Sequence, residues 1–309
     1  MKLLTLNTHS LAETEYERKL EAFVAGILEE QPDIMALQEV NQSISGEEVP
    51  LEELLASGYV ESVEMKDGSG DLLPSPAGQP ASAEPPHPIP PVRRDNHGFR
   101  VASLLVKAGC PYHWAWVPAK LGYGKYDEGT ALFSRRPIDR AFWQYLTDSR
   151  DYTNWKTRKA LGITVQTEGG AAHFFSLHMG WWQDEEEPFT KQWERLSRTA
   201  ETLKDTGAVW LMGDFNSQAG VRGEGYDLIR GAGWEDVYEA AARKGGEMTV
   251  PGEIDGWRTG EAASGMRIDY IWHGGAESVD ISWAGTVFDG KNRQAVSDHF
   301  GLMAEYARN

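Results

Sequence analysis

Residues 209–217, VWLMGDFNS, decide the fold that we expect, because a buried strand here runs directly into a charge. Val209 to Met212 form the kind of apolar run that lies inside a sheet, and Asp214 follows almost at once. A carboxylate at the mouth of an apolar strand is costly to desolvate unless water, a hydrogen-bond donor or a cation compensates it. The rest of the chain must therefore supply a partner for Asp214.

Other polar side chains follow strand-like runs in the same way. Asn7 follows KLLTL, Glu39 ends DIMALQE, and His178 ends FFSLH. The set is completed by Asn216 beside Asp214, Asp269 inside RIDYIW, and the pair Asp298 and His299 in VSDHF. Oxygen ligands of this kind suit a hard divalent cation, Mg²⁺ or Mn²⁺, whose charge stabilises buried carboxylates. Any one of these residues alone is more often a structural polar group, so the prediction rests on the whole set.

Strand-like runs recur along the chain and outnumber helical ones. We expect strands at residues 2–7, 33–40, 101–106, 113–117, 129–134, 161–166, 172–178, 208–214, 267–272, 280–288 and 299–306. Thr14 and Glu17 have the spacing of a capping box, which predicts a helix from there to about Pro32, and further helices are expected at 188–204 and 226–230. Both all-apolar and alternating strands occur. This mixture favours two packed sheets covered by helices over a barrel or a simple doubly wound sheet.

The composition restricts the partners and the compartment. Forty-seven acidic against 30 basic residues give a net charge of −17, which repels nucleic acids and acidic membranes at long range. The single cysteine, Cys110, excludes an intrachain disulfide and is expected to be a buried or half-buried apolar side chain. We find no signal-peptide core and no segment long enough to span a bilayer, so a cytoplasmic protein is expected. Residues 66–94, rich in Pro, Gly and Ser, predict a flexible surface loop inserted into one domain over residues 1–309.

Several longer blocks carry a family resemblance: LNTHS, LQEVNQS, GYGKYDEGTALFSRRPI, DYTNWKTRKALGI, LHMGWWQDEEEPF and EGYDLI. With the ordered polar set above, they resemble the endonuclease/exonuclease/phosphatase superfamily, which has the DNase I-like fold, over nearly the whole chain. Within it they resemble the bacterial maltose 6′-phosphate phosphatases most. The implied fold is an α/β four-layer sandwich of two packed mixed β-sheets flanked by helices. The stretch at 66–94 is longer than the family's usual connection, which affects the expected substrate rim but not the metal centre.

The resemblance also implies roles for the polar set. Glu39 would be the principal metal ligand, with Asn7 and Asp298 near the cation, and Asp214 and Asn216 would position the nucleophile and the phosphate. Asp269 would orient His299, and Glu128 in YDEG would orient His178. An imidazole held by a carboxylate has its tautomer fixed and its cationic form stabilised. The implied reaction is in-line attack by water on a phosphate monoester, and whether Asp214 or His299 is the general base stays open.

Tryptophans and cations indicate where the substrate would bind. Trp155, Lys156 and Arg158 lie in one block, while Trp181 and Trp182 follow the block that ends at His178. Indole faces stack on the apolar faces of sugar rings, and cations bind phosphate, although a tryptophan is as often a core residue. The remaining histidines lack such neighbours and are interpreted as surface or packing residues: His9, His87, His97, His113, His173 and His273.

The sequence therefore predicts an Mg²⁺-dependent phosphatase that releases phosphate from maltose 6′-phosphate or a related phosphorylated disaccharide. Its partner would be this small substrate, with no nucleic acid and no membrane, and the oligomeric state stays open. Three alternatives remain: a DNase I-like or abasic-site endonuclease, a sphingomyelinase-like phosphodiesterase acting at membranes, and a sugar-phosphate binding protein without activity. A nuclease would need a basic groove, which an acidic chain does not favour. A membrane enzyme would need an exposed apolar hairpin or a signal peptide, and neither is clear.

Overall fold

The computed structural model describes residues 1–65, 89–252, 265–275 and 279–308. Most of the predicted loop at 66–94, and His87 with it, lies outside these residues. The helical segments are η1 (Ser10–Ala12), α1 (Tyr16–Glu30), α2 (Leu51–Ala56), α3 (His97–Lys107), α4 (Phe189–Lys204), α5 (Gly225–Gly231) and α6 (Val237–Ala240). The strands are β1 (Lys2–Asn7), β2 (Ile34–Ser43), β3 (Val63–Glu64), β4 (His113–Gly122), β5 (Tyr126–Ser134), β6 (Ile138–Tyr145), β7 (Lys159–Thr167), β8 (Gly170–His178), β9 (Ala208–Asp214), β10 (Glu235–Asp236), β11 (Asp269–Gly274), β12 (Val279–Val287) and β13 (Gly301–Arg308).

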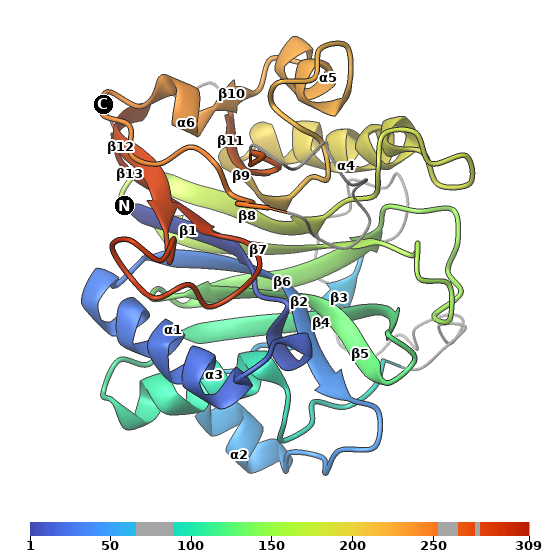
Figure 1. Ribbon diagram of the computed structural model, residues 1–309, viewed down its shortest axis with the longest axis vertical. Helices are drawn as coiled ribbons and strands as arrows, with labels where there is room; N and C mark the ends of the chain where they lie inside the picture. The colour runs from blue at the N-terminus through green and yellow to red at the C-terminus, as the bar shows by residue number, and fades with distance from the viewer. Residues whose placement is uncertain (66–88, 253–264, 276–278, 309) are drawn as a thin grey trace.

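The strands form two mixed sheets that pack face to face. One sheet has the order β12-β13-β1-β2-β5-β4, and the other has the order β10-β11-β9-β8-β7-β6-β3. Figure 1 shows both sheets between α1 and α3 on one side and α4 and α5 on the other. This is the four-layer α/β sandwich that the sequence predicted. In the part of the chain that the structure describes, no helix is long and apolar enough to cross a membrane.

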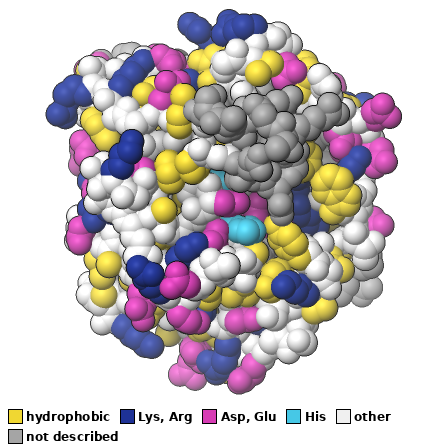
Figure 2. All heavy atoms as spheres, in the orientation of Figure 1, with side chains coloured by type: hydrophobic (Ala, Val, Ile, Leu, Met, Phe, Trp, Pro, Cys, Tyr) yellow, Lys and Arg dark blue, Asp and Glu magenta, His cyan; other side chains and the backbone are white. Residues whose placement is uncertain are grey.

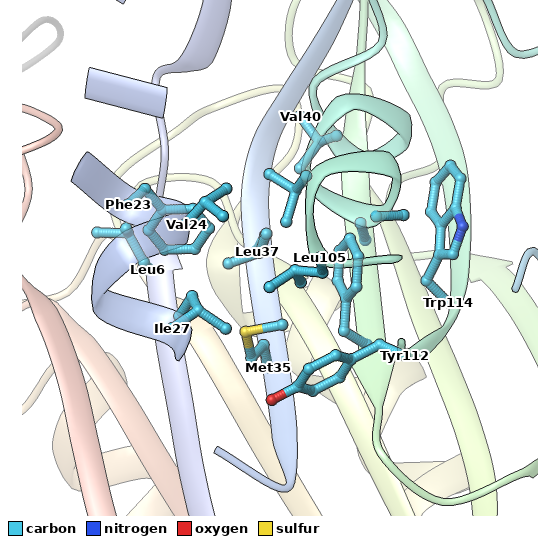
Figure 3. Packing of buried hydrophobic residues seen from close by; sticks show 14 of the residues in the cluster. Leu6, Phe23, Val24, Ile27, Met35, Leu37, Val40, Leu105, Tyr112 and Trp114 are labelled. Carbon is cyan, nitrogen blue, oxygen red and sulfur yellow. The ribbon is translucent and has the colours of Figure 1, made fainter. Parts of the chain in front are cut away.

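Alternate residues of the central strands explain the layers. Leu3 and Ile34 face the second sheet, whereas Leu4 and Met35 face the helices, and all four are buried. A strand that is apolar on both faces fits only where it is covered on both sides. Figure 3 shows the outer layer, in which Phe23 and Ile27 of α1 and Leu105 of α3 pack against Met35 and Leu37.

Two local predictions were wrong. Residues 101–106, predicted as a strand, lie in α3, where Phe99, Ala102 and Leu105 are buried at helical spacing and the Asn96 side chain accepts a hydrogen bond from the Phe99 N–H. A short apolar run does not distinguish a strand from a buried helix. The capping box at Thr14 is also absent, because α1 begins at Tyr16 after Glu15, which makes no side-chain cap.

The connections bring several strand ends to one place. β1 and β2 are parallel in the first sheet, and β8 and β9 are parallel in the second. Parallel neighbours end at the same edge, so Asn7 lies near Glu39, and His178 lies opposite Asp214. β11 runs antiparallel to β9 and starts with Asp269 opposite Asp214. The polar ends predicted from sequence therefore converge at one end of the sandwich.

Candidate active site

Asn7 links the polar ends of the two sheets. Its Nδ2 donates hydrogen bonds to Glu39 Oε1 at 2.9 Å and to Asp214 Oδ2 at 3.1 Å. His178 Nε2 lies 3.8 Å from Asp214 Oδ2 and 4.0 Å from Glu39 Oε1. Asp214 Oδ1 accepts a hydrogen bond from the backbone N–H of Asn216 at 2.8 Å, so both carboxylate oxygens have neutral donors. This is the partner set that the charge at the end of the VWLM run required.

His299 contacts Asp269 as predicted. Its Nδ1 lies 2.9 Å from Asp269 Oδ2, and its Nε2 lies 4.0 Å from Asp214 Oδ2. Both Asp269 and His299 are buried, and Asp269 lies behind the imidazole rather than in the pocket. The contact fixes which ring nitrogen faces Asp214.

Three residues of the site hold left-handed backbone conformations that cost free energy. φ is 49° at Glu39, 47° at Asn216 and 46° at His9. A non-glycine residue in this region costs roughly 1–3 kcal/mol and persists only where the surroundings enforce it. At Glu39 the cause is an irregularity in the pairing of β2 with β5 between Leu37 and Val40. Such backbone strain is common at functional sites, and here it coincides with the converging polar strand ends.

These side chains line a pocket of about 300 Å³, within the size range of small-molecule sites. Its walls are His9, Glu39, Lys120, Gly122, Tyr123, Glu128, Trp155, Arg158, His178, Trp181, Asp214, Asn216, Asp298 and His299. Figure 2 shows histidine and acidic side chains together near the middle of this face of the molecule. Acidic, cationic and aromatic side chains thus share one small cavity.

The carboxylates of the pocket fit a divalent cation. Burial and then Glu128 raise the pKa of Glu39, and burial and then Asp269 raise the pKa of Asp214 to about 7. Among the described residues, Glu39 has a hydrogen bond from Asn7 but no Lys or Arg ion pair. With Asp298 in the same pocket, this set of oxygen donors is of the type that Mg²⁺ or Mn²⁺ binds.

The two imidazoles differ in charge. Burial lowers the pKa of His299, but the negative charges of Asp269 and Asp214 outweigh it and raise the pKa to about 10. Burial, then Arg158 and Lys120, lowers the pKa of His178 well below its usual value. His299 is therefore an imidazolium at neutral pH, while His178 is neutral. A carboxylate partner that stabilises the cationic form is therefore present at His299, through Asp269, whereas the expected partner of His178, Glu128, pairs with Lys120.

Comparison with known proteins identifies the family. The Endonuclease/Exonuclease/phosphatase family matches residues 4–299, which is nearly the whole chain. The chain belongs to this family. Its members are hydrolases that generally depend on divalent metals, and the buried acidic and histidine groups of this site fit that chemistry. No curated protein matches the chain.

Solved structures support the same fold. An endonuclease/exonuclease/phosphatase family protein from Leptotrichia buccalis has 26% sequence identity and a TM-score of 0.78, with 99% of each chain covered. A mannosyl-6-phosphatase, Bt3783, from Bacteroides thetaiotaomicron has 14% identity and a TM-score of 0.60, with 99% of each chain covered. A truncated TDP2 from Caenorhabditis elegans has 16% identity and a TM-score of 0.60, covering 99% of this chain and 96% of its own. The last two show similarity of fold alone.

Three predicted site residues have other contacts. Glu128 does not hold His178 but pairs with Lys120, whose Nζ is 3.0 Å away, because the two residues are directly opposite on β5 and β4. Lys156 forms ion pairs with Asp184 at 2.9 Å and with Glu186 at 3.2 Å, and it does not line the pocket.

Trp182 likewise lies outside the pocket and packs against Phe189, with ring centroids 5.9 Å apart. The predicted pocket residues Trp155 and Trp181 lie together, with ring centroids 5.5 Å apart. Only two of the three tryptophans therefore belong to the site.

Sequence reasoning missed His9, Lys120 and Tyr123. His9 was interpreted as a surface or packing residue, but it lines the pocket, with Nδ1 3.0 Å from Glu13 Oε1 and 4.0 Å from Asp298 Oδ1. Burial lowers the pKa of His9, yet Glu13, Glu39 and Asp298 together raise it to about 9. The signal was its place two residues after Asn7 in LNTHS. His97 and His173 are buried among packed side chains, as expected.

Proposed function

We propose that this chain hydrolyses a sugar phosphate monoester with the help of Mg²⁺ or Mn²⁺, releasing sugar and inorganic phosphate. The substrate would be maltose 6′-phosphate or a related phosphorylated disaccharide. The observation that carries the proposal is one pocket with three kinds of wall: the carboxylates of Glu39, Asp214 and Asp298, the cations Lys120 and Arg158, and the indoles of Trp155 and Trp181. A metal ion, a phosphate and a sugar need these three surfaces.

Glu39, Asn7 and Asp298 would hold the cation, which when bound supplies neutralisation of phosphate charge. The chain's own residues would do the rest. His178, neutral and buried, would donate a hydrogen bond to the oxygens of the transition state. Asp214 and His299 would handle the proton of the attacking water, one as the base that accepts it and the other as a hydrogen-bond donor. A carboxylate with a pKa of about 7 suits a general base, whereas an imidazolium with a pKa of about 10 suits a donor. This difference favours Asp214 as the base.

The aromatic wall supports a sugar. Trp155 is 52% exposed, which is unusual for an indole, and it lies beside Trp181 at the pocket. The indole of Trp181 lines the pocket, and its buried Nε1–H has no hydrogen-bond partner among the described residues. The similarity to a protein named a mannosyl-6-phosphatase agrees with a sugar phosphate, although at 14% identity it does not identify the sugar.

A substrate panel tests the proposal. With Mg²⁺ present, we expect phosphate release from maltose 6′-phosphate and other phosphorylated sugars, and little cleavage of abasic DNA or of a phosphodiester lipid. Excess chelator should abolish the release, and added Mg²⁺ should restore it. Faster cleavage of abasic DNA than of any sugar phosphate would instead favour the abasic-site endonuclease. No turnover of any compound, with tight binding of a sugar phosphate, would favour the inactive binding protein.

Tryptophan variants test the sugar. Trp155→Ala and Trp181→Ala should raise KM for the preferred sugar phosphate by roughly 10-fold, because stacking and its buried area are lost, and should change KM for p-nitrophenyl phosphate much less. Trp182→Ala is the matched control, since it packs against Phe189 outside the pocket. It should lower the free energy of unfolding by roughly 3 kcal/mol and leave the ratio of kcat/KM values unchanged. An unchanged ratio in the first two variants would contradict stacking.

A further inference from the structure

Lys120 is a buried cation of the pocket. It belongs to β4, its residue is 7% exposed, and its side chain lines the cavity. Its Nζ lies 3.0 Å from Glu128 Oε1, and the register of β4 and β5 places the two residues directly opposite one another. A cation taken out of water at this depth needs a nearby anion. Glu128 is that anion in the described part of the chain.

Arg158 is a second buried cation, and it lacks such a partner. The residue is 3% exposed and lines the same pocket. Its Nη1 donates a long hydrogen bond of 3.4 Å to the backbone oxygen of Trp155, and its Nε has no hydrogen-bond partner among the described residues. No described carboxylate forms an ion pair with it, whereas the guanidinium of another buried arginine, Arg267, lies 2.7 Å from Asp236 Oδ2. A buried guanidinium with free donors is costly unless an anion arrives to use them.

Lys120 therefore has a carboxylate partner in Glu128, whereas the guanidinium of Arg158 has no ion pair, although both side chains line the same pocket. The absence of a side chain at Gly122 makes room for the Glu128 carboxylate beside Lys120, because a Cβ at Gly122 would lie 2.4 Å from Glu128 Oε2. The three donors of a lysine ammonium allow Nζ to keep Glu128 and still bind a further oxygen. The guanidinium of Arg158, which has no ion pair, and the remaining donors of the Lys120 ammonium fit an anion with more than one free oxygen.

We propose that Lys120, together with Arg158, binds the terminal oxygens of a phosphate dianion and makes the site select phosphate monoesters over phosphodiesters. This inference rests on the proposed function. A monoester carries a charge of about −1.5 to −2 at pH 7 and has three terminal oxygens. A diester has one charge and two such oxygens, because its third oxygen carries a second organic group. A diester at Lys120 and Arg158 would therefore present one terminal oxygen fewer to their donors and about half the charge.

The test compares Lys120→Met with a control on the same hairpin. Lys125→Met makes the same change of charge at an exposed position outside the pocket. A second variant, Lys120→Met with Glu128→Gln, removes both charges of the pair, so that neither Glu128 nor Lys120 is left buried and charged without the other. Circular dichroism and thermal melting establish that each protein is folded. The Mg²⁺-loaded enzymes are then compared on p-nitrophenyl phosphate and on bis(p-nitrophenyl) phosphate.

For Lys120→Met and for the double variant, we expect kcat/KM on the monoester to fall by roughly 10- to 100-fold, the range for a lost hydrogen bond to a charged group. The value on the diester should stay the same or rise. A readout independent of turnover is the binding of inorganic phosphate, measured by calorimetry or by its thermal stabilisation of the protein. Its Kd should rise by a similar factor in both variants. Lys125→Met should change neither quantity.

The outcomes separate the inference from the function on which it rests. If the wild-type protein prefers the diester, the proposed function is wrong, and the inference that the site selects monoesters is wrong as well. If the wild-type protein prefers the monoester but Lys120→Met keeps both the preference and the affinity for phosphate, the phosphatase stands and the inference is overturned. Equal losses of kcat/KM on monoester and diester, without weaker binding of phosphate, would show that Lys120 only forms a structural ion pair with Glu128. This result would also overturn the inference.

Discussion

Glu39→Gln is expected to lower kcat/KM by at least about 10³-fold, equivalent to ~4 kcal/mol of lost transition-state stabilisation. The change keeps the size of the side chain and its contact with Asn7 Nδ2, but it removes the negative charge that would bind the divalent cation. The loss should therefore appear mainly in kcat, or in the Mg²⁺ concentration needed for half-maximal rate, rather than in the fold.

Two measurements separate metal binding from structural damage. The wild-type protein should melt at a higher temperature with Mg²⁺ than with chelator, since a ligand that binds only the folded state stabilises it. Glu39→Gln should melt near the wild-type chelator value and respond weakly to Mg²⁺. Removing the charge of a buried carboxylate whose pKa is already raised should not destabilise the metal-free protein. Glu47→Gln, an identical change at an exposed carboxylate, is the matched control.

Full activity of Glu39→Gln, or of the wild-type protein in excess chelator, would exclude a metal at this carboxylate. A variant that is inactive but retains the full thermal response to Mg²⁺ would place the cation elsewhere in the pocket. In that case the cluster of His9, Glu13 and Asp298, whose ligand atoms lie within 4.8 Å of one another, would be the next place to test.

The layers of this fold could be predicted from the sequence because its strands are long and their burial is one-sided or complete. DIMALQE and VWLMGD are apolar over most of their length and end on a carboxylate, and such a pattern has few other interpretations. The polar ends could be expected to meet because parallel neighbours end at the same edge. Residues 101–106 could not be assigned in this way, since the run is short and its helical form is fixed by contacts with distant strands.

The errors at the site have a common physical origin. Which residue lies opposite Glu128 depends on the register of β4 and β5, and that register contains an irregularity between Pro118 and Lys120 that no local signal reveals. A shift of one residue turns every side chain to the other face. Lys120 was therefore missed, and His178 was given a partner that it does not have. His9 was missed for a related reason, because its left-handed backbone conformation is set by the turn after β1.

His299→Ala is expected to lower kcat by roughly 10²- to 10⁴-fold, the range for a positioned acid or base. Asp269→Asn should produce a large part of the same loss, because its Oδ2 is 2.9 Å from His299 Nδ1 and holds the ring in its cationic form. The double variant should lose little more than the worse single variant, as residues that act as a unit do. Measuring kcat of the wild-type protein, the two single variants and the double variant on one sugar phosphate gives this double-mutant cycle.

The pH profile gives a sharper test of the same pair. Activity should rise with pH as Asp214 loses its proton, with a midpoint at or below pH 7, because a bound cation favours the charged carboxylate. It should fall again as His299, whose pKa is raised to about 10, loses its own proton. Asp269→Asn removes the main charge that raises this pKa, so the alkaline limb should move to lower pH. His299→Ala should lose the limb altogether. An alkaline limb unchanged in Asp269→Asn, together with independent, multiplicative losses in the double variant, would show that the two residues do not act as a unit.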